Sequence, residues 1–146
     1  MAPRQPGSYA LIMRLHQGLA LEVGQLGRFY FPPGWYAYAG SARGPGGLAA
    51  RLSRHLRPVK AAHWHVDHLR AQSEVTAVWY TKGCRKQECI WALALSELPD
   101  ACVLAPGFGA SDCRCETHLL YYPKPPNRSM FARSVGDRVW EDLFHG

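Results

Sequence analysis

A tyrosine, an arginine and a histidine with reactive or charged side chains fall within one short stretch of this 146-residue sequence. Tyr38 closes an aromatic, strand-like run, and the chain then breaks at glycines that include a Gly-Pro-Gly-Gly turn over residues 44–47. Leucines four residues apart predict a helix over Leu48–Leu56, and Arg51 and His55, also four apart, share a neighbouring face of it. A strand end, a glycine turn and a basic helix face together favour the binding of a phosphate group.

Each of these side chains also has an ordinary structural explanation. A tyrosine at a strand end is usually half-buried, and polar residues such as Arg51 and His55 on an amphipathic helix usually face solvent. The ordered combination carries more information than its members. It consists of Tyr-x-Gly ending at Gly40, an arginine eleven residues later and a histidine four residues after that.

This combination resembles the GIY-YIG nuclease superfamily. The second signature of that family corresponds to Tyr38-Ala39-Gly40, and the first, on the opening strand, corresponds to Gly7-Ser8-Tyr9. The helical arginine of the family corresponds to Arg51, and the histidine found in some members corresponds to His55. A metal-binding glutamate on a later helix corresponds to Glu88.

Most of the chain is also similar to the small stand-alone Uri-type subfamily. The segments that carry this similarity are Phe31-Pro32-Pro33-Gly34, His63-Trp64-His65 and Phe108-Gly109-Ala110-Ser111-Asp112-Cys113.

The chain departs from the family pattern at several points, among them an unusually glycine-rich turn over residues 44–47 before the helix. Ser8 and Ala39 replace the usual middle residues of the two signatures, which we expect to change packing and to leave the chemistry intact. An asparagine that supports the site in some relatives has no match, because the only asparagine, Asn127, lies in a proline-rich segment.

The resemblance implies a metal-dependent endonuclease that hydrolyses DNA, with single-stranded or branched DNA among the candidate substrates. Tyr9 would act as the general base and His55 would take its proton, while Tyr38 would orient water or phosphate. Arg51 offers a planar fork that grips phosphate bidentately. Glu88 would hold one divalent cation, Mg²⁺ or Mn²⁺, that stabilises the leaving oxygen as a Lewis acid.

The residues around Glu88 leave its role open. Trp91, Ala92 and Leu95 follow it at helical spacing, so its carboxylate would extend an apolar face, which is costly unless the group is paired or bound to a metal. Alternatively, Glu88 stands in the first helical turn and complements the helix dipole. The residues alone favour the dipole role, whereas the resemblance favours the metal.

The charge balance suggests a polyanionic partner. The chain has 17 Lys and Arg against 11 Asp and Glu, a formal net charge of +6. We expect nucleic acid, and DNA rather than RNA, to be that partner, with its backbone following the basic residues that flank the site. These are Arg43, Arg54, Arg57 and Lys60.

Cysteine and histidine clusters allow a different interpretation. Two clusters contain zinc-ligand types, namely His63, His65 and His68, and Cys113, Cys115 and His118. Their spacing is irregular for a zinc finger, so structural Zn²⁺ is not favoured, and Cys89 and Cys102 could contribute only if the fold brought them near. Alternatively, the cysteines are small buried hydrophobes and the loop that carries Cys113 packs over the site.

The five cysteines and the N-terminal sequence bear on location. An odd number of cysteines without an export signal predicts a reducing cytoplasm, with thiols or metal ligands rather than a disulfide frame. No apolar run reaches the ~20 residues needed to cross a membrane. Three functions therefore remain in competition: a metal-dependent endonuclease, a catalytically inactive nucleic-acid-binding module, and a zinc-stabilised interaction domain.

The pattern of expected strands and helices predicts an α+β fold in one domain over residues 1–146. In this fold a small, mostly antiparallel sheet is flanked by helices and positions these residues. The first third reads as a β-meander of the strands Tyr9–Leu15, Leu19–Val23, Arg28–Phe31 and Trp35–Ala39. Helices are then expected over Leu48–Leu56, His63–Ala71 and Arg85–Leu98, and strands over Val75–Tyr80, Cys102–Leu104 and Leu119–Tyr122. A closing helix, capped by Ser129, is expected to reach about Phe144, with Phe131, Val135, Val139 and Leu143 as its buried side. We expect Tyr9, Tyr38, Arg51, His55 and Glu88 to line one concave, basic surface.

Overall fold

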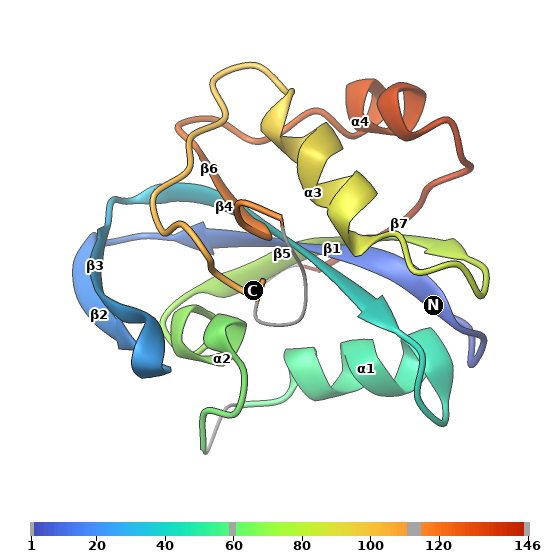
Figure 1. Ribbon diagram of the computed structural model, residues 1–146, viewed down its shortest axis with the longest axis horizontal. Coiled ribbons are helices and arrows are strands. Elements are labelled where there is room, and N and C mark those ends of the chain that lie inside the picture. The colour runs from blue at the N-terminus through green and yellow to red at the C-terminus, as the bar shows by residue number, and fades with distance from the viewer. Residues whose placement is uncertain (1, 59–60, 111–114, 145–146) are drawn as a thin grey trace.

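A five-stranded antiparallel sheet lies at the centre of the computed structural model, which describes residues 2–58, 61–110 and 115–144. The strand order is β6-β4-β1-β5-β7 (Figure 1). The strands are β1 (Gly7–Leu15), β4 (Gly34–Ala42), β5 (Glu74–Lys82), β6 (Leu119–Tyr122) and β7 (Trp140–Leu143). The helices are α1 (Gly47–Leu56), α2 (His65–Arg70), α3 (Glu88–Ser96) and α4 (Arg128–Val135). The predicted α+β class is confirmed.

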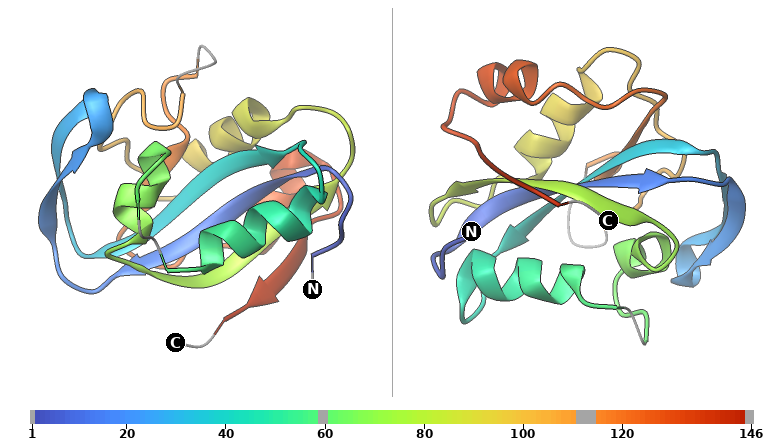
Figure 2. Two further views of the ribbon diagram at one scale, coloured as in Figure 1. Left: turned by 90° about the horizontal axis from the view of Figure 1, so that it is seen from below. Right: turned by 180° about the vertical axis from the view of Figure 1, so that it is seen from behind.

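The helices cover both faces of the sheet. Helices α1 and α2 lie on one face, and α3 and α4 lie on the other (Figures 1 and 2). Side chains alternate between the faces along β1, so Leu11 and Met13 join the core under α1 and α2, whereas Ala10 and Ile12 join the core under α3 and α4. Strand β1 is paired on both edges and covered on both faces, which explains its almost continuous apolar sequence.

The meander expected for the first third is interrupted. Strands β2 (Leu19–Val23) and β3 (Gly27–Phe31) form a separate two-stranded sheet, and β1 pairs directly with β4. Both edges of β1 are occupied by β4 and β5, so β2 has no edge there to join. The hairpin instead packs Val23 and Phe31 into the core shared with α1 and α2.

The predicted closing helix is wrong in its second half. Helix α4 ends at Val135 because Gly136 adopts a left-handed conformation with φ 74°, a common helix end. The residues that follow form β7, which pairs with the outer edge of β5 and becomes the edge strand on that side of the sheet. The cap is also two residues earlier than expected, because the Asn127 side chain, not that of Ser129, accepts from the Met130 N–H at 3.0 Å.

Three further elements are shorter than predicted. Helix α2 spans His65–Arg70 rather than His63–Ala71. Helix α3 begins at Glu88 rather than Arg85, and the strand expected over Cys102–Leu104 is reduced to a single bridge between Cys102 and Tyr121. None of the helices in the described ranges has the length and apolar character needed to span a bilayer.

Candidate active site

A cleft of about 380 Å³ lies at the end of β4 that extends past its neighbour β6. Strand β6 pairs with β4 only from Trp35 to Tyr38, so residues 39–42 of β4 continue beyond it. Four of the five predicted catalytic residues line this cleft, and they come from four different elements. These residues are Tyr9, Tyr38, Arg51 and Glu88.

The glycine of Tyr38-Ala39-Gly40 makes room for Tyr9. The sequence predicted a chain break at Gly40, but β4 continues to Ala42 and Gly40 lies directly opposite Tyr9 in the β1–β4 pairing. A Cβ added at Gly40 would lie 2.5 Å from the Tyr9 ring and its hydroxyl, so a side chain there would displace the tyrosine. The glycine therefore serves a close side-chain approach rather than a turn.

The Tyr9 hydroxyl and His55 Nε2 are hydrogen-bonded at 2.7 Å, and both residues are buried. His55 lies in α1 and packs behind Tyr9. It therefore contacts the group from behind and does not line the cleft, although we expected it to do so. Burial lowers the pKa of His55 to about 3, with Asp67 opposing the shift and nearby arginines reinforcing it. Burial and the neighbouring Tyr38 hydroxyl raise the pKa of Tyr9 despite the opposing effect of Arg51. Both members of the pair are therefore neutral at physiological pH.

Arg51 is held at the cleft by two contacts. Its Nη1 donates to the carbonyl oxygen of Ser41 at 3.0 Å, and its guanidinium lies over the ring of Trp64, 4.6 Å from the centroid. A guanidinium has five N–H donors, so these contacts leave donors of its fork for an anion.

Glu88 reaches the same cleft from the opposite face of the sheet. It is the first residue of α3, only 8% exposed, and its carboxylate accepts a hydrogen bond from the Ser41 hydroxyl. Lys86 Nζ lies 3.3 Å from the other carboxylate oxygen. Burial raises the pKa of Glu88, but the Ser41 hydroxyl and Lys86 outweigh it, so the pKa is lowered below its ordinary value. The carboxylate is thus charged and partnered, as a buried charge requires.

This carboxylate meets the requirements of a magnesium or manganese ligand. Mg²⁺ in proteins is commonly held by one or two carboxylates together with water and substrate phosphate oxygens. Glu88 supplies a charged carboxylate at the wall of an open cleft, opposite a guanidinium suited to phosphate. Lys86, its ion-pair partner, has a half-exposed side chain, so it can exchange its contact for one with solvent.

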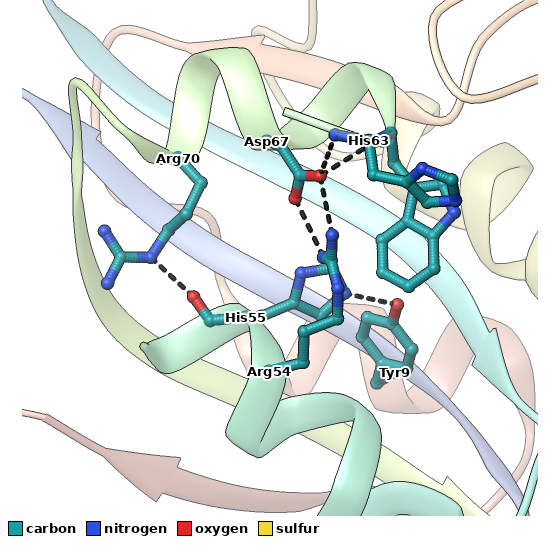
Figure 3. Close-up of polar contacts among 7 residues, drawn as sticks. Tyr9, Arg54, His55, His63, Asp67 and Arg70 are labelled. Carbon is teal, nitrogen blue, oxygen red and sulfur yellow. Dashed lines mark hydrogen bonds and ion pairs between the residues drawn. The ribbon is translucent and has the colours of Figure 1, made fainter. Parts of the chain in front are cut away.

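A second group of polar contacts holds α1 against α2 (Figure 3). Asp67, only 1% exposed, receives two hydrogen bonds of 2.9 Å from Arg54 and also accepts the backbone N–H groups of His63 and Trp64. Although burial raises the pKa of Asp67, these donors lower it to about 2. Sequence reasoning missed Asp67, although an acid three residues after Trp64, in the first turn of a helix, is a recognisable cap signal.

Arg70 supports the same arrangement from α2. Its Nε donates to the carbonyl oxygen of His55 at 2.8 Å, and its Nη2 donates to that of Leu56 at 3.1 Å. Figure 3 draws the first of these two bonds. Arg70 therefore satisfies carbonyl groups at the C-terminal end of α1 and fixes the backbone that carries His55.

The four basic residues expected to contact nucleic acid have different surroundings. Arg43 is exposed and lines the cleft. Arg57 is exposed and lines an adjoining hollow of about 220 Å³. Arg54 is committed to Asp67 and lies over Trp64, 3.8 Å from the ring centroid, so it has a structural partner as well as a place at that hollow. Lys60 lies outside the described residues.

The histidine and cysteine clusters are rearranged by the fold. His63 and His65 line the cleft, and His65 Nδ1 accepts the Gly109 N–H at 2.8 Å. Within the described ranges, the group of ligand types close enough to share a metal is Cys89, Cys115 and His118, rather than the His63, His65 and His68 set. Cys113 lies outside the described residues.

Two cysteine expectations are corrected. The structure joins Cys89 and Cys115 in a disulfide, whereas the sequence predicted thiols or metal ligands. Cys84 and Cys102 are free and exposed, so they are not the small buried hydrophobes of the alternative interpretation. The disulfide arises because the fold places two residues separated by 26 positions next to each other, which spacing does not reveal.

A comparison with protein families identifies a relationship that spans nearly the whole chain. Residues 8–140 match the model of a family described as Domain of unknown function DUF123. No curated protein and no solved structure matches the chain.

Proposed function

Because the chain belongs to DUF123, a GIY-YIG-like family, we propose that it is a metal-dependent endonuclease that hydrolyses phosphodiester bonds in DNA, of the stand-alone Uri type. One observation carries the proposal. Tyr9, Tyr38, Arg51 and Glu88 come from separate elements and line one cleft, with His55 bonded to Tyr9 behind it.

Glu88 is the residue that would hold the cation. Bound Mg²⁺ or Mn²⁺ would supply Lewis-acid stabilisation of charge on the leaving oxygen. The Ser41 hydroxyl orients the Glu88 carboxylate, as outer partners of ligating carboxylates commonly do.

Tyr9 and His55 provide a route for the proton of the attacking water. Tyr9 accepts a proton from water as its own hydroxyl proton passes to His55 Nε2, 2.7 Å away. The transfer uses the tautomer of neutral His55 that carries its proton on Nδ1, which leaves the lone pair on Nε2. The anionic phosphate of a bound substrate raises the pKa of His55, because a nearby negative charge favours the protonated imidazole. Substrate binding thus makes the transfer of the Tyr9 hydroxyl proton to His55 more favourable.

Arg51 and Tyr38 act on the phosphate itself. The free donors of the Arg51 fork bind non-bridging oxygens, where negative charge grows in the transition state. Tyr38 projects into the cleft from β4 beside Tyr9 and orients the water or the phosphate. Both residues are positioned before substrate arrives, since Arg51 is held by Ser41 and Trp64 and the Tyr38 ring packs edge-on against Phe108.

Cleavage of a small panel of labelled substrates tests the proposal. The panel contains single-stranded, double-stranded and branched DNA and a matched RNA, each with Mg²⁺, Mn²⁺ or a chelator. We expect metal-dependent cleavage of at least one DNA and no cleavage with chelator. Binding without cleavage of any substrate in either metal would overturn the enzyme proposal and favour an inactive binding module.

Glu88→Ala separates the metal role from a helix-dipole role. We expect a loss of ~10²–10³ in single-turnover rate, the cost of removing a charge-stabilising element, with nucleic-acid binding largely retained. Glu97→Ala, an exposed glutamate just after the end of the same helix, is the matched control and should cleave normally. Normal cleavage by Glu88→Ala together with a lowered melting temperature would assign Glu88 to helix stability alone.

A further inference from the structure

A group of soft metal-ligand types lies beside the cleft and has no part in the proposed hydrolysis. The ligand atoms of Cys89, Cys115 and His118 all lie within 4.8 Å of one another. Cys89 Sγ is 3.7 Å from His118 Nε2. Cys89 belongs to the first turn of α3, whereas Cys115 and His118 precede β6, so the group joins two segments that are distant in the chain.

The backbone around this group is fixed by hydrogen bonds. The His118 N–H donates to the Phe108 carbonyl at 2.8 Å, and the His118 carbonyl accepts the Ala39 N–H at 2.9 Å. The Gly107 N–H donates to the Glu116 carbonyl at 2.6 Å. His118 and the residue after Cys115 are therefore held in a hydrogen-bonded loop, while Cys89 is held in a helix, and this preorganisation reduces the ordering cost of binding.

We propose that Cys89, Cys115 and His118 bind one Zn²⁺ ion after a thiol reductant has supplied two electrons to the Cys89–Cys115 disulfide, is itself oxidised to a disulfide, and leaves both cysteines as thiolates. Two sulfurs and one imidazole are a ligand set suited to zinc, with Zn–S near 2.3 Å and Zn–N near 2.0 Å. Tetrahedral coordination places two such sulfurs about 3.8 Å apart, a separation that rotation of the side chains reaches once the Cys89–Cys115 bond is reduced. The fourth position is left to a ligand that the described residues do not supply.

This site differs from the Glu88 site in its ligand atoms and in the role of the bound ion. Glu88 offers hard carboxylate oxygen, whereas the adjacent Cys89 offers soft sulfur. Zinc at this position ties the start of α3, and so the backbone of Glu88, to the loop that carries His118 at the wall of the cleft. The ion has a structural role, and its presence does not depend on the proposed nuclease activity.

Metal content tests the site without any substrate. Protein purified without chelator, in a phosphine reductant, should contain about one zinc per chain. Cys89→Ser, Cys115→Ser and His118→Asn should each lose most of it. Cys84→Ser and Cys102→Ser, which alter exposed free cysteines, are matched controls and should keep it.

Alkylation of the wild-type chain gives an answer even if these variants fold poorly. With zinc present, Cys89 and Cys115 should react slowly and Cys84 and Cys102 rapidly; after chelation in reductant, Cys89 and Cys115 should become reactive. Peptide mass mapping identifies the labelled residues. The proposal is overturned if Cys89 and Cys115 react equally fast with and without zinc, if they stay disulfide-bonded in reductant with zinc, or if Cys89→Ser retains the metal. A chain that holds zinc but cleaves nothing would contradict only the nuclease proposal.

Discussion

Ser41 connects two side chains that reach the cleft from opposite faces of the sheet. Its carbonyl oxygen accepts a hydrogen bond from Arg51, and its hydroxyl donates to Glu88. It stands immediately after Gly40 in β4, and no feature of its sequence position indicated such a role. One small residue thus aligns the phosphate-binding and metal-binding groups of the proposed site.

Ser41→Ala should weaken metal binding more than catalysis. The substitution keeps the backbone carbonyl for Arg51 but removes the donor that orients the Glu88 carboxylate, and loss of such a partner typically costs 10–100-fold in metal affinity. We expect the Mg²⁺ concentration for half-maximal single-turnover cleavage to rise at least roughly tenfold. Ser53→Ala, an exposed serine of α1, is the control. An unchanged Mg²⁺ dependence for Ser41→Ala would mean that Ser41 does not position Glu88.

At the scale of elements, the pairing of β1 with β4 decides where the two tyrosines lie. Tyr9 is opposite Gly40, and Leu11 is opposite Tyr38, so both tyrosines project from the same face of the sheet on adjacent strands. The contacts of Asp67 and Arg70 then hold α1 and α2 so that His55 meets Tyr9.

Gly40→Ala tests this close packing of strands. The added Cβ would lie 2.5 Å from the Tyr9 ring, so the ring or the strand must shift, and overpacking of this kind costs roughly 1–3 kcal/mol. We expect a lower free energy of unfolding and a disrupted Tyr9–His55 bond, measured by thermal or urea unfolding and by cleavage rate. Gly44→Ala is the matched control, because no described atom lies within 4 Å of a Cβ added there. Equal free energies of unfolding for the two variants would show that the Tyr9 ring can shift without loss of stability.

At the scale of the whole molecule, the exposed arginines beside the cleft predict how DNA binding responds to salt. Arg43→Ala and Arg57→Ala should each lower the slope of log affinity against log salt by about 0.7–0.9 if each residue contacts one phosphate. The loss should be similar for all sequences, because phosphate contacts carry no base readout. Titrations at several salt concentrations measure the slope.

Arg133→Ala is the control for this measurement, since Arg133 is exposed on α4, across the sheet from α1. Arg54→Ala should behave differently, because it leaves the buried Asp67 carboxylate without its partner and so lowers stability as well. If neither Arg43→Ala nor Arg57→Ala changes the slope, the DNA backbone follows another surface.

The buried His55 predicts that the fold loses stability in mild acid. The pKa of His55 is about 3 in the folded chain and near 6.5 when unfolded, so between these pH values the unfolded state binds a proton that the folded state does not. Stability should therefore fall as pH drops from about 6.5 toward 3. Asp67, with a pKa lowered to about 2, adds to this loss only below about pH 4.

Urea unfolding between pH 7 and pH 4.5 measures the His55 contribution. We expect His55→Gln to reduce the pH slope of the unfolding free energy by up to about 1.4 kcal/mol per pH unit, whatever its effect at pH 7. His16→Gln, an exposed histidine, should leave the slope nearly unchanged. An identical slope for wild type and His55→Gln would mean that His55 titrates normally in the folded chain.

Local patterns were enough to predict much of the molecule. The four-residue spacing of leucines predicted α1 and placed Arg51 and His55 on it, and the apolar run after Glu88 predicted α3. Such periodicity reflects which face of an element is buried, so one segment suffices to read it. The order of the signature residues likewise indicated which side chains to examine, before any distance between them was known.

Pairings between distant residues were decided by the tertiary structure alone. The final segment became β7 because β5 offered an open edge, and β1 joined β4 instead of its neighbour in sequence. The contacts of Ser41 with Glu88 and of Cys89 with Cys115 span 47 and 26 residues. A pattern in sequence records the environment of each residue, burial or exposure, but not the identity of its partner. That identity depends on how the strands and helices pack, which is why the cleft and the cysteine–histidine group emerged only from the folded chain.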